Sequence, residues 1–119
     1  MAYRRQANSK YNAVKTQIDG ITFASRKEGR RYQELKMLER ARRIRQLVLQ
    51  PRYLLLDKYV NGAGLKIRAI YYVADFEYVD HAGRKIVEDV KSAATATPVY
   101  KLKKKLFEKK YFPLTVTEI

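Results

Sequence analysis

Cysteine is absent from this 119-residue sequence. Its absence excludes a disulfide framework and any thiolate metal site, and it fits a reducing cytoplasm. Histidine is nearly absent as well, because His81 is the only one. His81 stands in the turn-like stretch 80–83, where we expect a surface position rather than a catalytic one.

Long apolar runs are also missing. No stretch approaches the roughly 18 apolar residues of a membrane-spanning helix. Residues 1–10 are polar and basic, with no apolar core of a signal peptide. We therefore expect a cytoplasmic protein that does not enter a membrane. Its length fits one domain with a real core, and we predict a basic, flexible arm over residues 1–17 and a single domain over 18–119.

Acidic residues are scarce relative to basic ones. The chain has 26 Lys and Arg against 12 Asp and Glu, a formal net charge of +14. A field of this sign attracts polyanions, and nucleic acid is the usual partner. An anionic membrane surface would respond to the same field, and a protein that is merely basic is the plainer alternative.

The order of predicted elements indicates the fold class. The Asp-Gly pair within 18–23 predicts a hairpin, and Ser25 with Glu28 forms the capping box of a helix that runs to about Arg43. Thr97-Pro98 predicts the start of a second helix, whose apolar stripe would hold Val99, Leu102, Leu106 and Phe107. Extended segments are predicted at 47–49, 52–59, 66–78, 85–91 and 114–119. Helix, strands, helix, strand predicts an α+β domain, in the broad α/β class, with a mixed sheet flanked by helices.

Two strands carry acidic residues where strands disfavour them. Asp75 follows the run 71–74, and Glu88-Asp89 follows Ile86-Val87. Side chains alternate along a strand, so Asp89 and Lys91 share one face and Glu88 points to the other. A hairpin centred near 81–83 would bring Asp75 level with about Asp89.

Two carboxylates and an ammonium at one place suit phosphate chemistry. Carboxylate oxygens are hard ligands for Mg²⁺ or Mn²⁺, and Lys91 could polarise water or stabilise the transition state. The plainer alternative is a solvated strand face, in which Asp89 and Lys91 form a weak ion pair and Asp75 ends its strand. Asp75, Asp89 and Lys91 together, in a chain of this charge, favour a catalytic site.

Asp75, a spacer of about a dozen residues, and then Asp89-Val90-Lys91 resemble the motif of the PD-(D/E)XK nuclease superfamily. Ala74 stands where that motif has proline. The fuller pattern, over about residues 8–119, resembles a phage and prophage family of small uncharacterised proteins assigned to that superfamily. It comprises 20–35, 49–53, 72–76, 87–91 and 100–107.

The resemblance implies a restriction-endonuclease-like αβββαβ core and a Mg²⁺- or Mn²⁺-dependent DNA endonuclease acting in a bacterial host. It implies metal ligation by Asp75, Asp89 and the Val90 backbone carbonyl, with Lys91 assisting the attacking water and a 5′ phosphate as product. Glu28 would complete the catalytic and metal site from the first helix, although it could instead serve only the capping box. Small phage members of the superfamily suggest a homodimer that resolves branched DNA, such as a Holliday junction, in recombination or replication.

Basic side chains on both predicted helices are candidate phosphate contacts, although a solvated helix face would look the same. They are Arg26, Lys27, Arg30, Arg31, Lys101, Lys104 and Lys105. Two other functions stay open: a non-catalytic DNA-binding accessory protein, and an RNA-binding or ribosome-associated protein.

Overall fold

The computed structural model describes residues 14–119, which form two compact units. One unit ends at Ile44 and the other runs from Arg45 to Ile119. Most of the predicted arm, residues 1–13, lies outside the described residues, whereas Thr16 and Gln17 already belong to the first strand. The single domain over 18–119 stays a prediction.

The first unit contains a hairpin and a helix: β1 (Thr16–Ile18), β2 (Ile21–Phe23) and α1 (Arg26–Arg40). The hairpin turns at Asp19-Gly20, as predicted. Both residues have positive φ, 54° and 76°, which is the conformation of the two-residue turn that Asp-Gly favours. Ile18 therefore lies opposite Ile21.

Helix α1 begins as its sequence predicts. The Ser25 Oγ accepts a hydrogen bond from the Glu28 N–H at 3.1 Å, which satisfies one of the donors left over at a helix start. Glu28, Tyr32 and Leu35 are buried along one face of the helix, and Leu38 is half-buried. The helix ends at Arg40, before the predicted end at about Arg43.

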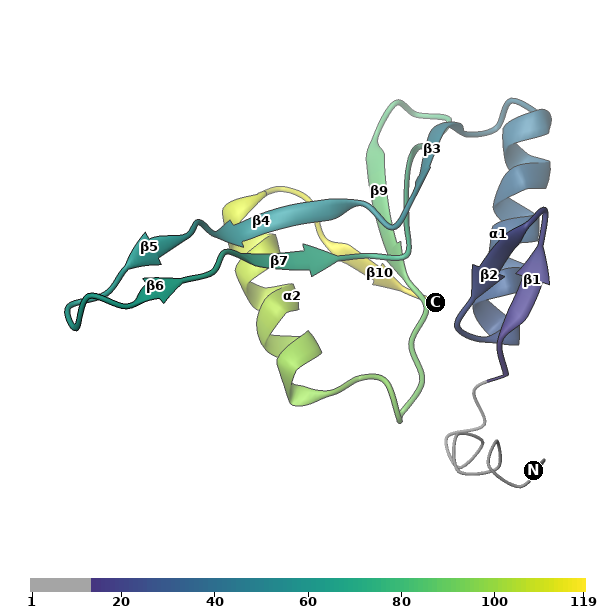
Figure 1. Ribbon diagram of the computed structural model, residues 1–119. Coiled ribbons are helices and arrows are strands. Elements are labelled where there is room, and N and C mark those ends of the chain that lie inside the picture. The colour runs from purple at the N-terminus through teal and green to yellow at the C-terminus, as the bar shows by residue number, and fades with distance from the viewer. Residues whose placement is uncertain (1–13) are drawn as a thin grey trace, which may run out of the picture. The chain divides into compact units, whose positions relative to one another are not determined.

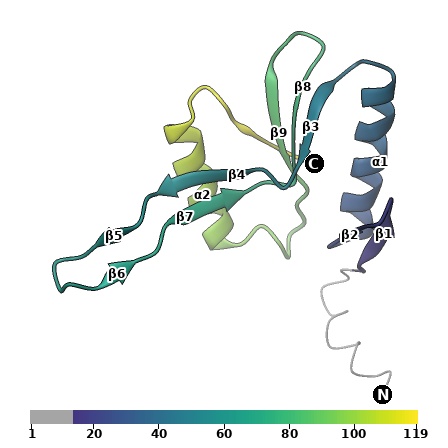
Figure 2. The same cartoon turned by 45° about the horizontal axis from the view of Figure 1, so that its top comes forward.

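The second unit contains eight strands and a helix, shown in Figure 1. They are β3 (Arg45–Leu49), β4 (Arg52–Leu56), β5 (Tyr59–Val60), β6 (Lys66–Ile67), β7 (Ile70–Val73), β8 (Phe76–Val79), β9 (Lys85–Asp89), α2 (Pro98–Lys110) and β10 (Val116–Glu118). Four strands form one sheet in the order β10-β9-β8-β3, in which β10 runs parallel to β9 and the other pairs are antiparallel. Figure 2 shows β3, β8 and β9 side by side.

This architecture is α+β with a mixed sheet, so the predicted fold class is confirmed. Along the chain, α1, β3, β8, β9, α2 and β10 follow the predicted order of helix, three strands, helix and strand. The pairs β4-β7 and β5-β6 are inserted between β3 and β8.

The prediction of one strand over 66–78 is wrong, because the chain divides there into β6, β7 and β8. The break before β8 is one side of a bend. Gln50 adopts a positive φ of 51°, and its N–H donates to the Asp75 carbonyl at 3.0 Å, while the Ala74 N–H donates to the Pro51 carbonyl at 3.1 Å. The two strands of the hairpin therefore change direction at the same level. We call this place, Gln50–Pro51 with Ala74–Asp75, the bend.

The pairing register is unchanged across the bend. Leu49 lies opposite Phe76 before it, and Arg52 lies opposite Val73 after it. Strands β3 to β8 are therefore one long hairpin that leaves the four-stranded sheet at the bend. Residues 52–73 beyond the bend are called the ribbon, and residues 58–68 are called its tip.

Helix α2 packs through aromatic side chains. Thr97 caps it as predicted, accepting from the Tyr100 N–H at 3.1 Å. The predicted apolar stripe is wrong in part: Val99, Leu102 and Leu106 are exposed, whereas Tyr100 and Phe107 are buried. The buried face is aromatic because it meets an aromatic strand surface, and large rings bury the most area.

The core of the second unit lies between α2 and the strands. The Phe107 ring is 4.6 Å from that of Tyr53 and 5.2 Å from that of Tyr72, between centroids. Val87 of β9 and Val116 of β10 belong to the same cluster. The core therefore joins α2, the four-stranded sheet and the near half of the ribbon. Within residues 14–119, no helix is long and apolar enough to cross a membrane.

Candidate active site

The register of β8 and β9 sets the two aspartates side by side. Phe76 lies opposite Glu88, and the Asp75 N–H donates to the Glu88 carbonyl at 3.1 Å. One further step in the same register brings Asp75 level with Asp89. The predicted juxtaposition is confirmed, and it occurs at the bend, just before β8 begins.

The alternation of β9 separates its two acids, as predicted. Glu88 is 1% exposed and its carboxylate accepts from the Tyr78 hydroxyl. Asp89 is also buried, but its Oδ2 accepts from the Tyr72 hydroxyl at 2.5 Å and its Oδ1 lies 3.2 Å from the Lys91 Nζ. Glu88 therefore has a structural environment of its own, apart from Asp89 and Lys91.

Asp75 is fixed by the backbone of the strand beside it. Its Oδ2 accepts from the Val90 N–H at 2.7 Å. On the opposite edge, the Asp89 carbonyl accepts from the Ile119 N–H at 2.9 Å. Because backbone groups of successive extended residues point to opposite edges, the Val90 carbonyl lies on the edge that faces Asp75.

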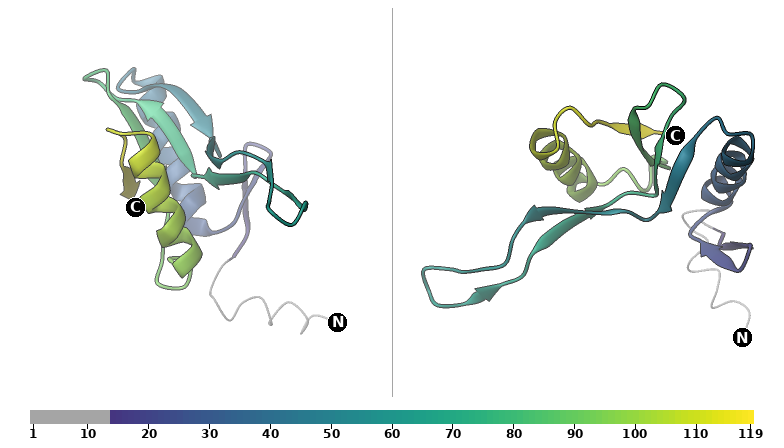
Figure 3. Two further views of the ribbon diagram at one scale, coloured as in Figure 1. Left: turned by 90° about the vertical axis from the view of Figure 1, so that its left-hand side faces the viewer. Right: turned by 90° about the horizontal axis from the view of Figure 1, so that it is seen from above.

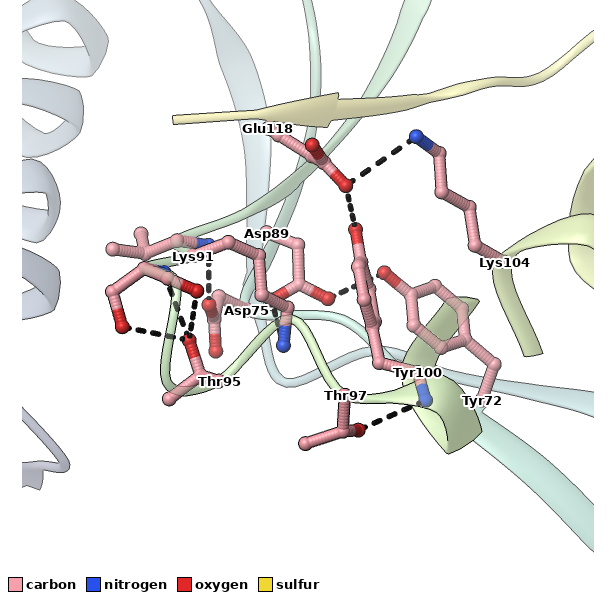
Figure 4. Close-up of polar contacts among 11 residues, drawn as sticks. Tyr72, Asp75, Asp89, Lys91, Thr95, Thr97, Tyr100, Lys104 and Glu118 are labelled. Atoms are coloured by element: carbon pink, nitrogen blue, oxygen red, sulfur yellow. Dashed lines mark hydrogen bonds and ion pairs between the residues drawn. The ribbon is translucent and has the colours of Figure 1, made fainter. Parts of the chain in front are cut away.

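Lys91 lies between acidic and aromatic groups. Its Nζ is 3.2 Å from Asp89 Oδ1 and 4.0 Å from the centroid of the Tyr100 ring. An ammonium over the face of a ring is attracted by the ring quadrupole. Figure 4 shows Asp75, Asp89 and Lys91 with their charged ends gathered in one place. The Lys91 side chain is 20% exposed, so solvent reaches this group of charges.

Two tyrosines, Tyr72 and Tyr100, also contact the charged groups of the site. Burial raises the pKa of the Tyr72 hydroxyl, and its hydrogen bond to Asp89 raises that pKa further. It therefore stays protonated and keeps donating to Asp89. The Tyr100 hydroxyl donates to Glu118 Oε2 at 2.6 Å and thereby lowers the pKa of Glu118.

The only sequence feature that pointed to hydrogen-bonded tyrosines was their high number. The chain has 10 tyrosines, and a buried tyrosine hydroxyl needs a hydrogen-bond partner. Which carboxylate serves which hydroxyl depends on side chains 17 and 18 residues apart in sequence. Local pattern does not reveal such pairs.

The donor set fits a hard divalent cation. Asp75, Asp89 and the Val90 carbonyl offer oxygen ligands, which Mg²⁺ and Mn²⁺ prefer. Over residues 14–119, no three His, Cys, Asp or Glu side chains group as metal ligands. Mg²⁺ commonly takes only one or two carboxylates and completes its shell with water and substrate phosphate, so two carboxylates are sufficient.

Glu28 belongs to the first unit, at the start of α1, and is 7% exposed. Its backbone N–H serves the Ser25 cap. Its carboxylate as a fourth member of the site stays a prediction.

The predicted phosphate contacts occupy helix surfaces. Arg26, Lys27 and Arg30 of α1 are exposed, as are Lys101 and Lys105 of α2. Arg31 pairs with Glu34 at 3.0 Å, and Lys104 with Glu118 at 3.3 Å. A phosphate would compete with those two carboxylates, so Arg31 and Lys104 are the weaker candidates.

A family model described as "Protein of unknown function (DUF1064)" matches residues 8–119 of the chain. The chain therefore belongs to that family. No curated protein and no solved structure matches it.

Proposed function

We propose that this member of the DUF1064 family is a divalent-metal-dependent DNA endonuclease of the PD-(D/E)XK type. The observation that supports it is the gathering of Asp75, Asp89 and Lys91 where β8 and β9 meet the bend. A net charge of +14 suits a polyanionic substrate.

The side chains divide the work. Asp75, Asp89 and the Val90 carbonyl would hold Mg²⁺ or Mn²⁺. The cation would act as a Lewis acid on a phosphate oxygen and make a bound water more acidic. Lys91, 3.2 Å from Asp89, orients the attacking water and stabilises charge that develops on the phosphate. The water displaces the 3′ oxygen in line and leaves a 5′ phosphate.

The contacts around this site hold its charged groups in position before the reaction. Tyr72 fixes one oxygen of Asp89, the Val90 N–H fixes one oxygen of Asp75, and the Tyr100 ring lies against Lys91. Groups held in this way need little reorganisation during reaction. We propose branched DNA as the substrate and a homodimer as the active form, because one site per protomer cuts one strand.

The decisive experiment compares two isosteric neutralisations of neighbouring buried acids. Asp89→Asn removes a proposed ligand, whereas Glu88→Gln changes the acid on the opposite face of β9. Branched, flapped and linear DNA are incubated with Mg²⁺ or Mn²⁺. We expect cleavage by the wild type and by Glu88→Gln, and none by Asp89→Asn. Equal cleavage by both variants would refute this site.

Metal binding has an independent readout. A cation that binds only the native state raises the melting temperature. Mn²⁺ should therefore raise it for the wild type and Glu88→Gln but not for Asp75→Asn.

A non-catalytic DNA-binding protein is the second candidate. Both carboxylate oxygens of Asp89 already have protein partners, Tyr72 and Lys91, as they would in a purely structural ion pair. Binding of all three DNA forms without any cutting would favour this candidate. Preference for RNA, with no effect of metal, would instead favour an RNA-binding protein.

A further inference from the structure

The tip of the ribbon extends away from the rest of its unit. Figure 3 shows β5 and β6 beyond α2 and the four-stranded sheet. Among the described strands, β5 and β6 pair only with each other. Tyr59, Val60 and Leu65 are 48%, 64% and 60% exposed. Two strands alone are marginally stable in water, and exposed apolar groups together often mark a binding surface.

The register gathers the tip's charges on one face. Tyr59 lies opposite Ile67, and Val60 lies opposite Lys66. Because side chains alternate along both strands, Lys66 and Val60 share a face. One step further in the same register places Lys58 and Arg68 on that face too. Tyr59 and Ile67 then occupy the other face.

This face has one sign of charge. From Lys58 to Arg68 the sequence contains three basic residues and no acidic one. All three basic side chains are exposed. A hollow of the ribbon surface is lined by these three together with Tyr59, Val60 and Ile67. A polyanion with regularly spaced charges is the complementary partner.

The end of the tip is narrow and ordered. The Asn61 Oδ1 accepts from the N–H groups of Ala63 and Leu65, at 2.9 and 3.0 Å. Gly64 takes a positive φ of 81°, which a side chain would strain. The turn carries only small groups at Gly62, Ala63 and Gly64. A two-stranded ribbon of this kind fits the major groove of B-DNA, which is about 12 Å wide.

We infer that the ribbon is an arm that grips double-stranded DNA, with Lys58, Lys66 and Arg68 on its phosphates. The inference rests on the proposed function for the choice of DNA as polyanion. It concerns binding alone, so a test without divalent metal separates its failure from the failure of catalysis.

The test measures binding of a labelled DNA duplex in EDTA, over a range of salt concentrations. One variant carries Lys58→Ala, Lys66→Ala and Arg68→Ala. The matched control loses the same charge elsewhere, through Arg40→Ala, Arg43→Ala and Arg45→Ala, all exposed positions. A charge-preserving variant carries Lys58→Arg, Lys66→Arg and Arg68→Lys. Circular dichroism confirms that each variant is folded.

Each phosphate contact contributes about 0.9 to the slope of log K against log salt concentration. The ribbon variant should therefore lose about 2 to 3 from that slope and bind at least about tenfold more weakly at about 0.15 M salt. The slope for the control should fall by less than about 1, and the charge-preserving variant should bind DNA as the wild type does.

Two results would overturn the inference. Equal losses in the ribbon variant and its control would mean that only the overall field matters. Unchanged DNA binding by the ribbon variant would also contradict it. If, in addition, Tyr59→Lys and Leu65→Lys converted a dimer to a monomer, the ribbon would instead bind a second copy of the chain.

Discussion

The two halves of the ribbon belong to one hairpin, yet only one of them is covered by a helix. The half formed by β4 and β7 packs against α2, and Tyr53 and Tyr72 are buried there at 8% and 2% exposure. The tip formed by β5 and β6 keeps Tyr59 and Val60 largely exposed. Tyr53 and Tyr72 face the helix and are buried, whereas Tyr71 of β7 and Tyr59 of the tip are 36% and 48% exposed.

The difference shows that burial on this hairpin depends on the neighbouring helix and not on strand sequence alone. In the covered half, the two buried tyrosines donate hydrogen bonds to carboxylates, Tyr53 to Glu77 and Tyr72 to Asp89. In the tip, charges of one sign accumulate without an acid in the sequence between Lys58 and Arg68. The covered half positions a site, and the tip presents a surface.

The largest expected loss of stability follows from weakening the packing of α2 on the ribbon. Phe107→Ala removes the ring that packs on both Tyr53 and Tyr72. Its side chain is fully buried, so the free energy of unfolding should fall by about 3–5 kcal/mol. Val60→Ala in the tip should change it by less than about 0.5 kcal/mol. Urea unfolding measures both, and similar losses would contradict the division into halves.

A smaller effect separates the two covered tyrosines. Tyr72→Phe and Tyr53→Phe each remove a hydroxyl that donates to a carboxylate at 2.5 Å. Each should cost about 1.5–3 kcal/mol of stability, as hydrogen bonds to charged groups do.

Only Tyr72→Phe should also lower cleavage, by about 10–100-fold, because its partner is a proposed metal ligand. Single-turnover cleavage measures this, and Tyr53→Phe is the control. An equal loss of cleavage in both variants would assign Tyr72 a purely structural role.

The smallest effect lies in the turn of the tip. Gly64→Ala places a side chain at a φ of +81° in open space, which costs about 1–2 kcal/mol of local stability. Gly62→Ala meets no atom and needs no positive φ, so it serves as the control. Amide hydrogens of β5 and β6 should exchange at least about fivefold faster in Gly64→Ala, while global unfolding is unchanged. Loss of global stability would mean that the tip supports the core.

The sequence predicted the elements better than their partners. Strong local signals located the hairpin at Asp19-Gly20, the start of α1 at Ser25 and the start of α2 at Thr97. The division of 66–78 was missed, because β-branched and aromatic residues continue through it and the bend depends on Gln50 across the hairpin. Helical spacing predicted Val99, Leu102, Leu106 and Phe107 as the buried stripe. Phe107 is buried as predicted, but Tyr100 takes the place of the other three against the aromatic strand surface.

At the site, strand alternation was enough to separate Asp89 from Glu88, and hairpin symmetry was enough to set Asp75 beside Asp89. Both are local properties of two adjacent strands. The contributions of Tyr72 and Tyr100 could not be predicted, because they come from a different strand and from α2. The role of Glu28 stays a prediction.

The continuous hairpin sets an upper limit on the distance between the tip of the ribbon and Asp75. No residue is inserted or lost at the bend itself, and the register shifts by one residue only between Leu54 and Leu56, on the way to the tip. At about 3.3 Å per extended residue, the path from Lys66 to Asp75 spans roughly 30 Å. One turn of B-DNA spans about 34 Å. If the ribbon holds a duplex at Lys66 and the proposed site cuts it, the bend keeps these two contacts within about one helical turn of each other.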